Sequence, residues 1–132
     1  MTSRRPAARS RKAARRRPAD DAALREILAA CGDRKALDGV VLDLRTLSDA
    51  ADYFVVVSGT SDTHVRAIAE HVIERLAAHG VRAHHVEGLS AGRWVLLDFV
   101  DILVHVFHPT LRAFYQLENL WADAPQARMP ES

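Results

Sequence analysis

Cysteine is almost absent from this chain of 132 residues, in which Cys31 is the single thiol. A disulfide framework needs pairs of cysteines and a thiolate metal site needs several, so both are excluded within one chain. No run of 18 apolar residues is present, so the sequence offers no candidate membrane-spanning helix. With 48% hydrophobic residues, the chain has the length and composition of one soluble domain in a reducing compartment.

Carboxylates are absent from residues 1–19, which hold eight of the 18 Lys and Arg residues. The rest of the chain keeps ten basic residues and all 17 acidic ones, a net charge of −7. Because the first 19 residues have little apolar bulk, we interpret them as a disordered basic arm. Its candidate RNA contacts are Arg11, Lys12, Arg15, Arg16 and Arg17. Three alternatives stay open: a solvated tail, a start codon assigned too far upstream, and an organellar transit peptide.

Apolar side chains then recur with helical spacing, at Leu24, Ile27, Leu28 and Cys31. Asp20 and Asp21 precede this stripe and Gly32 follows it, which predicts a helix of about three turns. Two strands are predicted at residues 39–47 and 53–59, a helix from Ser61 to the residue before Gly80, and three short strands at residues 81–88, 93–99 and 101–107. A last helix is predicted to carry Leu111, Phe114, Leu117 and Trp121.

The resulting order, αββαβββα, predicts a single α/β domain over residues 20–124. Its mixed β-sheet of about five strands should be flanked by helices, because each helix needs an apolar surface to cover its stripe. The near-continuous apolar run from Phe54 to Val57 indicates a strand that is covered on both faces. Residues 125–132 are expected to form a flexible C-terminal tail.

The segment Ser58-Gly59-Thr60-Ser61 joins a predicted strand to a predicted helix, an arrangement that often binds phosphate. A second interpretation needs no ligand, because Thr60 or Ser61 can cap the helix and Gly59 can make the turn. The sequence lacks the lysine of a Walker loop and the GxGxxG of a dinucleotide loop. Asp62 would also repel an incoming phosphate. The local pattern therefore favours a structural turn.

Other polar residues raise the question of a metal. Asp98 and Asp101 flank a predicted strand turn and could hold Mg²⁺, although aspartate is equally common in turns without a metal. His105 and His108 could approach one another, but no third zinc ligand is placed by spacing. For His105 we therefore favour a hydrogen-bonded structural histidine. No nucleophile–base pattern is present, so the residues themselves indicate no catalyst.

Three longer blocks carry a more specific signal: DYFVVVSGTSDTHVRAIAEHV, VEGLSAGRWVLLDFVDILVHVF and RAFYQLENLWADA. Together they resemble the ribosomal silencing factor family, also called Iojap-related, over roughly residues 20–124. The resemblance implies a nucleotidyltransferase-like α/β fold without transferase activity or a cofactor. It also implies a translational repressor that binds the large ribosomal subunit through ribosomal protein uL14 and blocks joining of the small subunit under nutrient limitation. Homodimers are common in the family.

The resemblance further implies a set of partner-binding residues, namely Trp94, Leu96, Asp98 and Phe99. Strand alternation places Phe99 on the opposite face from Trp94. Val100 stands where the family often has glycine, so we expect no positive φ there. A second departure is Thr63, which stands where a basic residue is frequent.

The resemblance favours a cytoplasmic location, or an organellar matrix if the arm is a transit peptide. The alternative function is a metal-dependent, nucleotidyltransferase-like enzyme that uses Ser58, Gly59 and Ser61, with a metal on Asp98 and Asp101.

Overall fold

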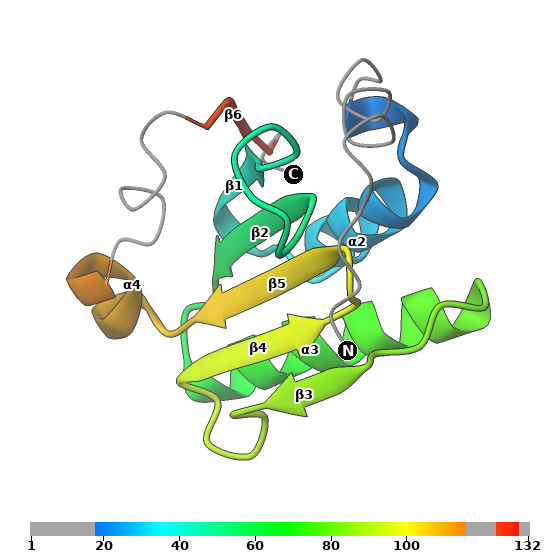
Figure 1. The fold of residues 1–132 in the computed structure, drawn as a ribbon. Helices are drawn as coiled ribbons and strands as arrows, with labels where there is room; N and C mark the ends of the chain where they lie inside the picture. The colour runs from blue at the N-terminus through cyan, green and yellow to red at the C-terminus, as the bar shows by residue number, and fades with distance from the viewer. Residues whose placement is uncertain (1–17, 116–123, 130–132) are drawn as a thin grey trace.

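The computed structural model describes residues 18–115 and 124–129, which form one mixed β-sheet with helices (Figure 1). The elements in chain order are the short 3-10 helix η1 (Pro18–Asp20), α2 (Ala22–Asp33), β1 (Leu37–Asp43), β2 (Tyr53–Ser58), α3 (Asp62–Ala78), β3 (His85–Glu87), β4 (Trp94–Asp98), β5 (Ile102–Phe107), α4 (Pro109–Tyr115) and β6 (Gln126–Arg128). The predicted α/β class with a mixed sheet is confirmed. The expected likeness to nucleotidyltransferases stays a prediction.

The strands lie in the order β3-β4-β5-β2-β1-β6. The central pair, β2 and β5, is parallel, with Tyr53 opposite Ile102. Every other pair in the sheet is antiparallel. Parallel neighbours need a crossover, and here the chain between β2 and β5 supplies α3 and the β3–β4 hairpin. As a result α2 and α3 lie together on one face of the sheet (Figure 1).

The main core lies between these two helices and the sheet. It contains the α2 stripe of Leu24, Ile27 and Cys31, as the spacing predicts. Both predicted helix starts are confirmed: Asp21 caps α2 by accepting the Leu24 N–H, and Ser61 caps α3 by accepting the His64 N–H. Within the described residues, no helix is long and apolar enough to cross a bilayer.

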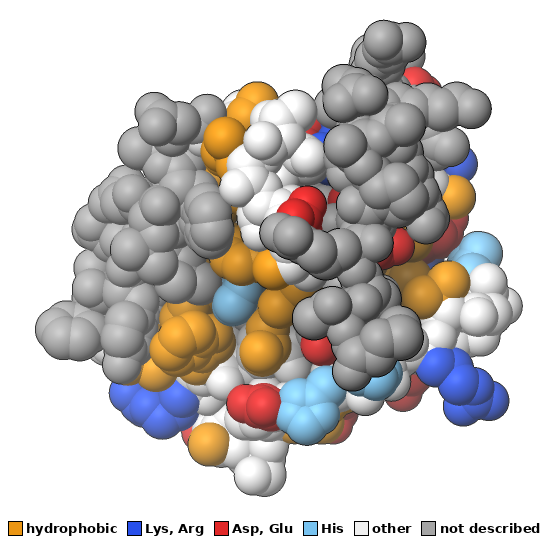
Figure 2. Space-filling model, viewed as in Figure 1, with side chains coloured by type: hydrophobic (Ala, Val, Ile, Leu, Met, Phe, Trp, Pro, Cys, Tyr) orange, Lys and Arg blue, Asp and Glu red, His pale blue; other side chains and the backbone are white. Residues whose placement is uncertain are grey.

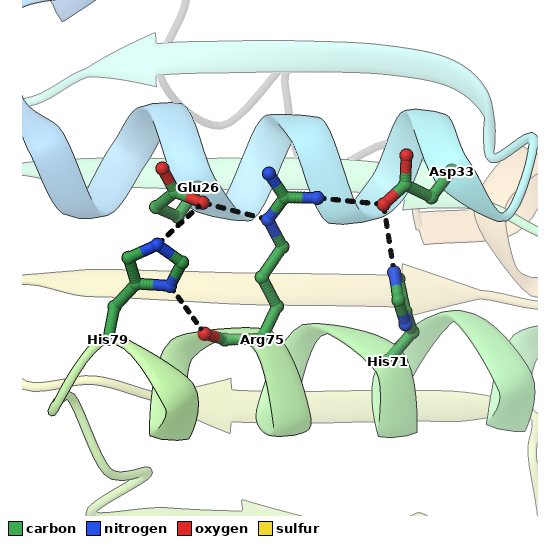
Figure 3. Close-up of polar contacts among 5 residues, drawn as sticks. All are labelled: Glu26, Asp33, His71, Arg75 and His79. Carbon is green, nitrogen blue, oxygen red and sulfur yellow. Dashed lines mark hydrogen bonds and ion pairs between the residues drawn. The ribbon is translucent and has the colours of Figure 1, made fainter.

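A polar network joins the exposed sides of α2 and α3 (Figure 3). Arg75 donates from Nε to Glu26 Oε1 at 2.7 Å and from a terminal nitrogen to Asp33 Oδ2 at 2.8 Å. His71 lies 3.0 Å from the same Asp33 oxygen, and His79 lies 3.5 Å from Glu26. The hydrogen bond from Arg75 lowers the pKa of Glu26, and the one from His71 lowers the pKa of Asp33.

The sixth strand was not predicted. Residues 125–132 are expected to be a flexible tail, yet β6 pairs antiparallel with β1, placing Ala127 opposite Val41. The three residues of β6 are all exposed and do not alternate between buried and exposed, so no side-chain pattern predicts the strand. Backbone pairing forms it instead, and the Met129 N–H extends it by donating to the Gly39 carbonyl at 2.8 Å.

The predicted last helix is described only in part, since α4 ends at Tyr115 and the positions of Leu117 and Trp121 lie outside the described residues. The five candidate RNA contacts in the arm lie outside them as well.

The turn between β4 and β5 corrects a second expectation. Val100 has a φ of 75°, although its side chain favours a negative value. Two residues make this loop, because the Phe99 N–H donates to the Ile102 carbonyl at 2.9 Å. Hairpin loops of this length favour positive φ at their first residue, since the twist of the strands requires it. The Asp101 N–H also donates to the Phe99 carbonyl, so loop geometry overrides the preference of valine.

A candidate partner-binding face on the sheet

The face of the sheet that α2 and α3 do not cover carries aromatic side chains. We call it the aromatic face and define it by Phe54 of β2, Trp94 and Leu96 of β4, and His105 and Phe107 of β5. Strand alternation brings these residues together, because every second side chain points to the same side. Figure 2 views the molecule from this side and shows hydrophobic side chains gathered over the sheet.

Trp94 lies at the start of β4 and is half-buried. Its indole ring stacks on Phe107, with the ring centres 4.9 Å apart and the planes at 30°. Its Nε1–H donates to His105 Nδ1 at 3.2 Å. Residue register explains both contacts, since Trp94 is opposite Phe107 and diagonal to His105 across the β4–β5 pair.

His105 is buried, with 6% of its surface exposed. Burial disfavours the charged ring and lowers the pKa of His105 to about 4. The Phe54 ring lies against it, with the ring centres 4.9 Å apart. Its Nε2 is buried and finds no hydrogen-bond partner among the described residues. The prediction of a hydrogen-bonded structural histidine at this position is confirmed.

Leu96 and Asp98 continue the same side of β4 toward the hairpin turn, and both are partly exposed. Asp98 Oδ1 accepts the Val100 N–H at 2.7 Å, so the turn role predicted for this aspartate is confirmed. Phe99 points the other way and lies in the main core with 8% of its surface exposed. The structure therefore brings together Trp94, Leu96 and Asp98 and separates Phe99 from them.

The Ser-Gly-Thr-Ser loop uses its polar groups within the chain. The Thr60 N–H donates to His64 Nδ1 at 2.8 Å, and Ser61 Oγ caps α3. Ser58 is buried and its Oγ accepts from Arg112 at 3.0 Å. A side chain on Gly59 would start 2.9 Å from the Val65 nitrogen, so the loop packs closely on the helix. This arrangement matches a structural turn.

Metal ligands do not converge in the part of the chain that the structure describes. No group of three or more His, Cys, Asp and Glu side chains is placed to hold an ion there. Cys31 is buried among apolar residues, which raises the pKa of its thiol to about 12. Asp98 and Asp101 serve the hairpin: Asp101 donates its N–H to Phe99 and accepts the Asp52 N–H at its carbonyl.

Comparison with known proteins identifies the family of this chain. A family model described as "Ribosomal silencing factor during starvation" matches residues 17–132. The chain belongs to this ribosomal silencing factor family. A silencing factor of Bacillus subtilis is 44% identical over 99 residues, which cover 75% of this chain and 84% of the relative.

Two further relatives extend the comparison. A crystal structure of a Chromobacterium violaceum protein, 34% identical, superposes with a TM-score of 0.74 over 76% of this silencing-factor chain and 83% of that one. The mouse protein called "Mitochondrial assembly of ribosomal large subunit protein 1" is 34% identical over 73 residues. Those residues cover 53% of this chain and 32% of the mouse protein.

Sequence reasoning on the silencing factor missed the neighbours of Trp94. Phe54, His105 and Phe107 complete the aromatic face, yet each was assigned only to a strand or left as a single structural residue. The alternation of His105 and Phe107 on one strand was the available signal. Placing them beside Trp94 requires the β4–β5 register, which the sequence does not specify.

Proposed function

We propose that this chain represses translation by binding the large ribosomal subunit through ribosomal protein uL14 and blocking the joining of the small subunit. Family membership supports a ribosome-associated silencing role rather than an enzymatic one. The name of the mouse relative links that protein to the large subunit. The single structural observation that carries the proposal is the side of β4 formed by Trp94, Leu96 and Asp98, which stays partly exposed on the face that α2 and α3 leave uncovered.

The chemistry of this surface suits a protein partner. Tryptophan is among the side chains that carry most binding energy in interfaces, and Leu96 beside the half-buried Trp94 adds apolar area. Acidic residues lie at the end of the sheet that Asp98 marks. Asp52 and Asp101 lie directly before β2 and β5 there, whereas Asp43, at the end of β1, is already paired with Arg45. Such an end favours a basic protein surface, and ribosomal proteins are generally basic. The homodimer suggested by the resemblance stays a prediction.

The proposal is tested by sedimentation with purified subunits. The protein should co-sediment with large subunits, not with small ones, and should reduce the formation of whole ribosomes from separated subunits. Trp94→Ala should weaken binding by about 2 kcal/mol or more, since it removes the central apolar contact. A buried core tryptophan would instead cost about 3–5 kcal/mol of folding stability, which denaturation measures separately. Equal binding to both subunits, or unchanged binding by a folded Trp94→Ala variant, would contradict the proposal.

A further inference from the structure

The tryptophan of the aromatic face is held by a hydrogen bond inside the protein. An indole N–H can only donate, so the nitrogen that accepts it, His105 Nδ1 at 3.2 Å, carries no proton. In a neutral imidazole the proton then resides on Nε2. The His105 ring is itself held in place, since it is buried on the face of β5 and lies against Phe54, with ring centres 4.9 Å apart.

This arrangement has a cost that packing alone does not explain. Within residues 18–115 and 124–129, His105 Nε2 is buried without a hydrogen-bond partner, and a leucine or phenylalanine at this position would avoid that cost. Burial keeps the ring neutral, because it lowers the pKa of His105 to about 4, so Nδ1 is available as an acceptor at neutral pH. Unlike an apolar residue, histidine supplies a hydrogen-bond acceptor for the indole N–H of Trp94.

We propose that His105 is a positioning residue for Trp94, which accepts the indole N–H and fixes the ring so that the protein partner packs on its carbon surface instead of bonding its nitrogen. The inference rests on the proposed function, because the partner is the ribosomal protein named there. Stacking on Phe107, with ring centres 4.9 Å apart, holds the ring from a second direction. Together the two contacts restrict both the tilt and the rotation of the indole before the partner arrives, which reduces the entropy lost on binding.

The Trp94→Phe variant distinguishes this inference from an interface in which the indole N–H donates to the partner. In many interfaces the indole N–H donates to the partner, so that replacing tryptophan by phenylalanine removes a hydrogen bond. Here the N–H is already engaged within the chain. Trp94→Phe should therefore bind isolated uL14 within about threefold of the wild type, while Trp94→Ala should lose about thirtyfold or more. The stability of each variant is measured separately by denaturation, because Trp94→Phe leaves His105 Nδ1 without its donor.

Two substitutions at His105 test the positioning role. His105→Leu removes the acceptor and keeps a side chain of similar bulk. His105→Asn places an acceptor, Oδ1, close to where the histidine Nδ1 lies. The indole N–H of Trp94 is followed by ¹⁵N NMR, with Trp94→Phe assigning its signal against that of Trp121. In His105→Leu this N–H should exchange faster with water and the affinity for uL14 should fall about tenfold. His105→Asn should restore both readouts.

His71→Leu is the matched control, since His71 lies on α3 across the sheet and contacts Asp33. It should change neither the indole signal nor the affinity. Trp94→Phe binding as weakly as Trp94→Ala would overturn the inference, because the partner would then be using the N–H. Faster exchange in His105→Leu with unchanged affinity would overturn it too, by making His105 purely structural. A wild type that fails to bind uL14 would overturn the proposed function and the role of the partner, while the exchange data would still decide whether His105 holds the indole.

Discussion

Val100 combines a φ of 75° with a β-branched side chain at the first position of a two-residue hairpin loop. Left-handed backbone costs a non-glycine residue about 1–2 kcal/mol, and glycine avoids most of that cost but loses about 0.5–1 kcal/mol in chain entropy. The Val100 side chain is 59% exposed, so little packing is at stake. Val100→Gly should therefore raise the free energy of unfolding by about 1 kcal/mol in chemical denaturation. Val86→Gly, on the edge strand β3, is the control and should be destabilising; a drop in stability for both would contradict the strain.

His105 predicts a pH dependence of stability. Its folded pKa of about 4 lies below the ordinary value of 6.5, so the unfolded chain binds a proton first as the pH falls. Above pH 6.5 the neutral His105 ring makes its full contribution to the free energy of unfolding. That contribution falls by about 3 kcal/mol as the pH drops from 6.5 to 4, and it changes no further below pH 4. His105→Asn should remove this slope from unfolding free energies measured between pH 7 and 4. An unchanged slope would mean that other groups cause it.

Arg75 links α2 and α3 at their exposed sides, where it bridges Glu26 and Asp33 (Figure 3). All three side chains reach solvent, so salt should screen their attraction. Arg75→Gln should lower the melting temperature at low ionic strength, and the difference from the wild type should shrink in 1 M salt. Arg82→Gln removes one charge outside this network and should have little effect at either salt concentration. A loss for Arg75→Gln that persists in high salt would indicate packing by its aliphatic part instead.

Elements with regular periodicity were predictable from the sequence, because their signals are local. The stripe of α2, its cap at Asp21 and the cap of α3 at Ser61 each depend on residues only a few positions apart in the sequence. Strand β6 and the φ of Val100 were not predictable, since backbone pairing and loop closure decide them. The same holds for the site. Trp94 was recognised from the resemblance, whereas its hydrogen bond to His105 depends on the register of two strands.

At the scale of the whole molecule, charge is divided between the first 17 residues and the rest of the chain. Residues 2–17 hold all eight cations of the basic arm, and the remainder carries a net charge of −7. Cations that contact RNA phosphates release counterions, so their contribution falls steeply with salt and carries no sequence preference. Deleting residues 2–17 should therefore flatten the salt dependence of large-subunit binding and leave the choice of subunit unchanged.

The matched control for the deletion keeps the arm at full length and replaces Arg11, Lys12, Arg15, Arg16 and Arg17 by glutamine. If all five contact phosphates, the slope of log affinity against log salt should fall by about 4. Loss of discrimination between the subunits in either variant would mean that the arm, and not the folded domain, recognises the ribosome.

The parallel pairing of β2 with β5 has a consequence for how the chain reaches its fold. Tyr53 and Ile102 are neighbours in the sheet although more than a third of the chain separates them. Contacts between residues so far apart in the sequence form late, since the chain between them must close into a loop first. Until β5 has emerged from the ribosome, the nascent chain therefore exposes one edge of β2. The backbone of Val55, Val56 and Val57 is unpaired along that edge. Unpaired apolar edges attract other chains, so the interval before β5 emerges is when this protein is most exposed to aggregation.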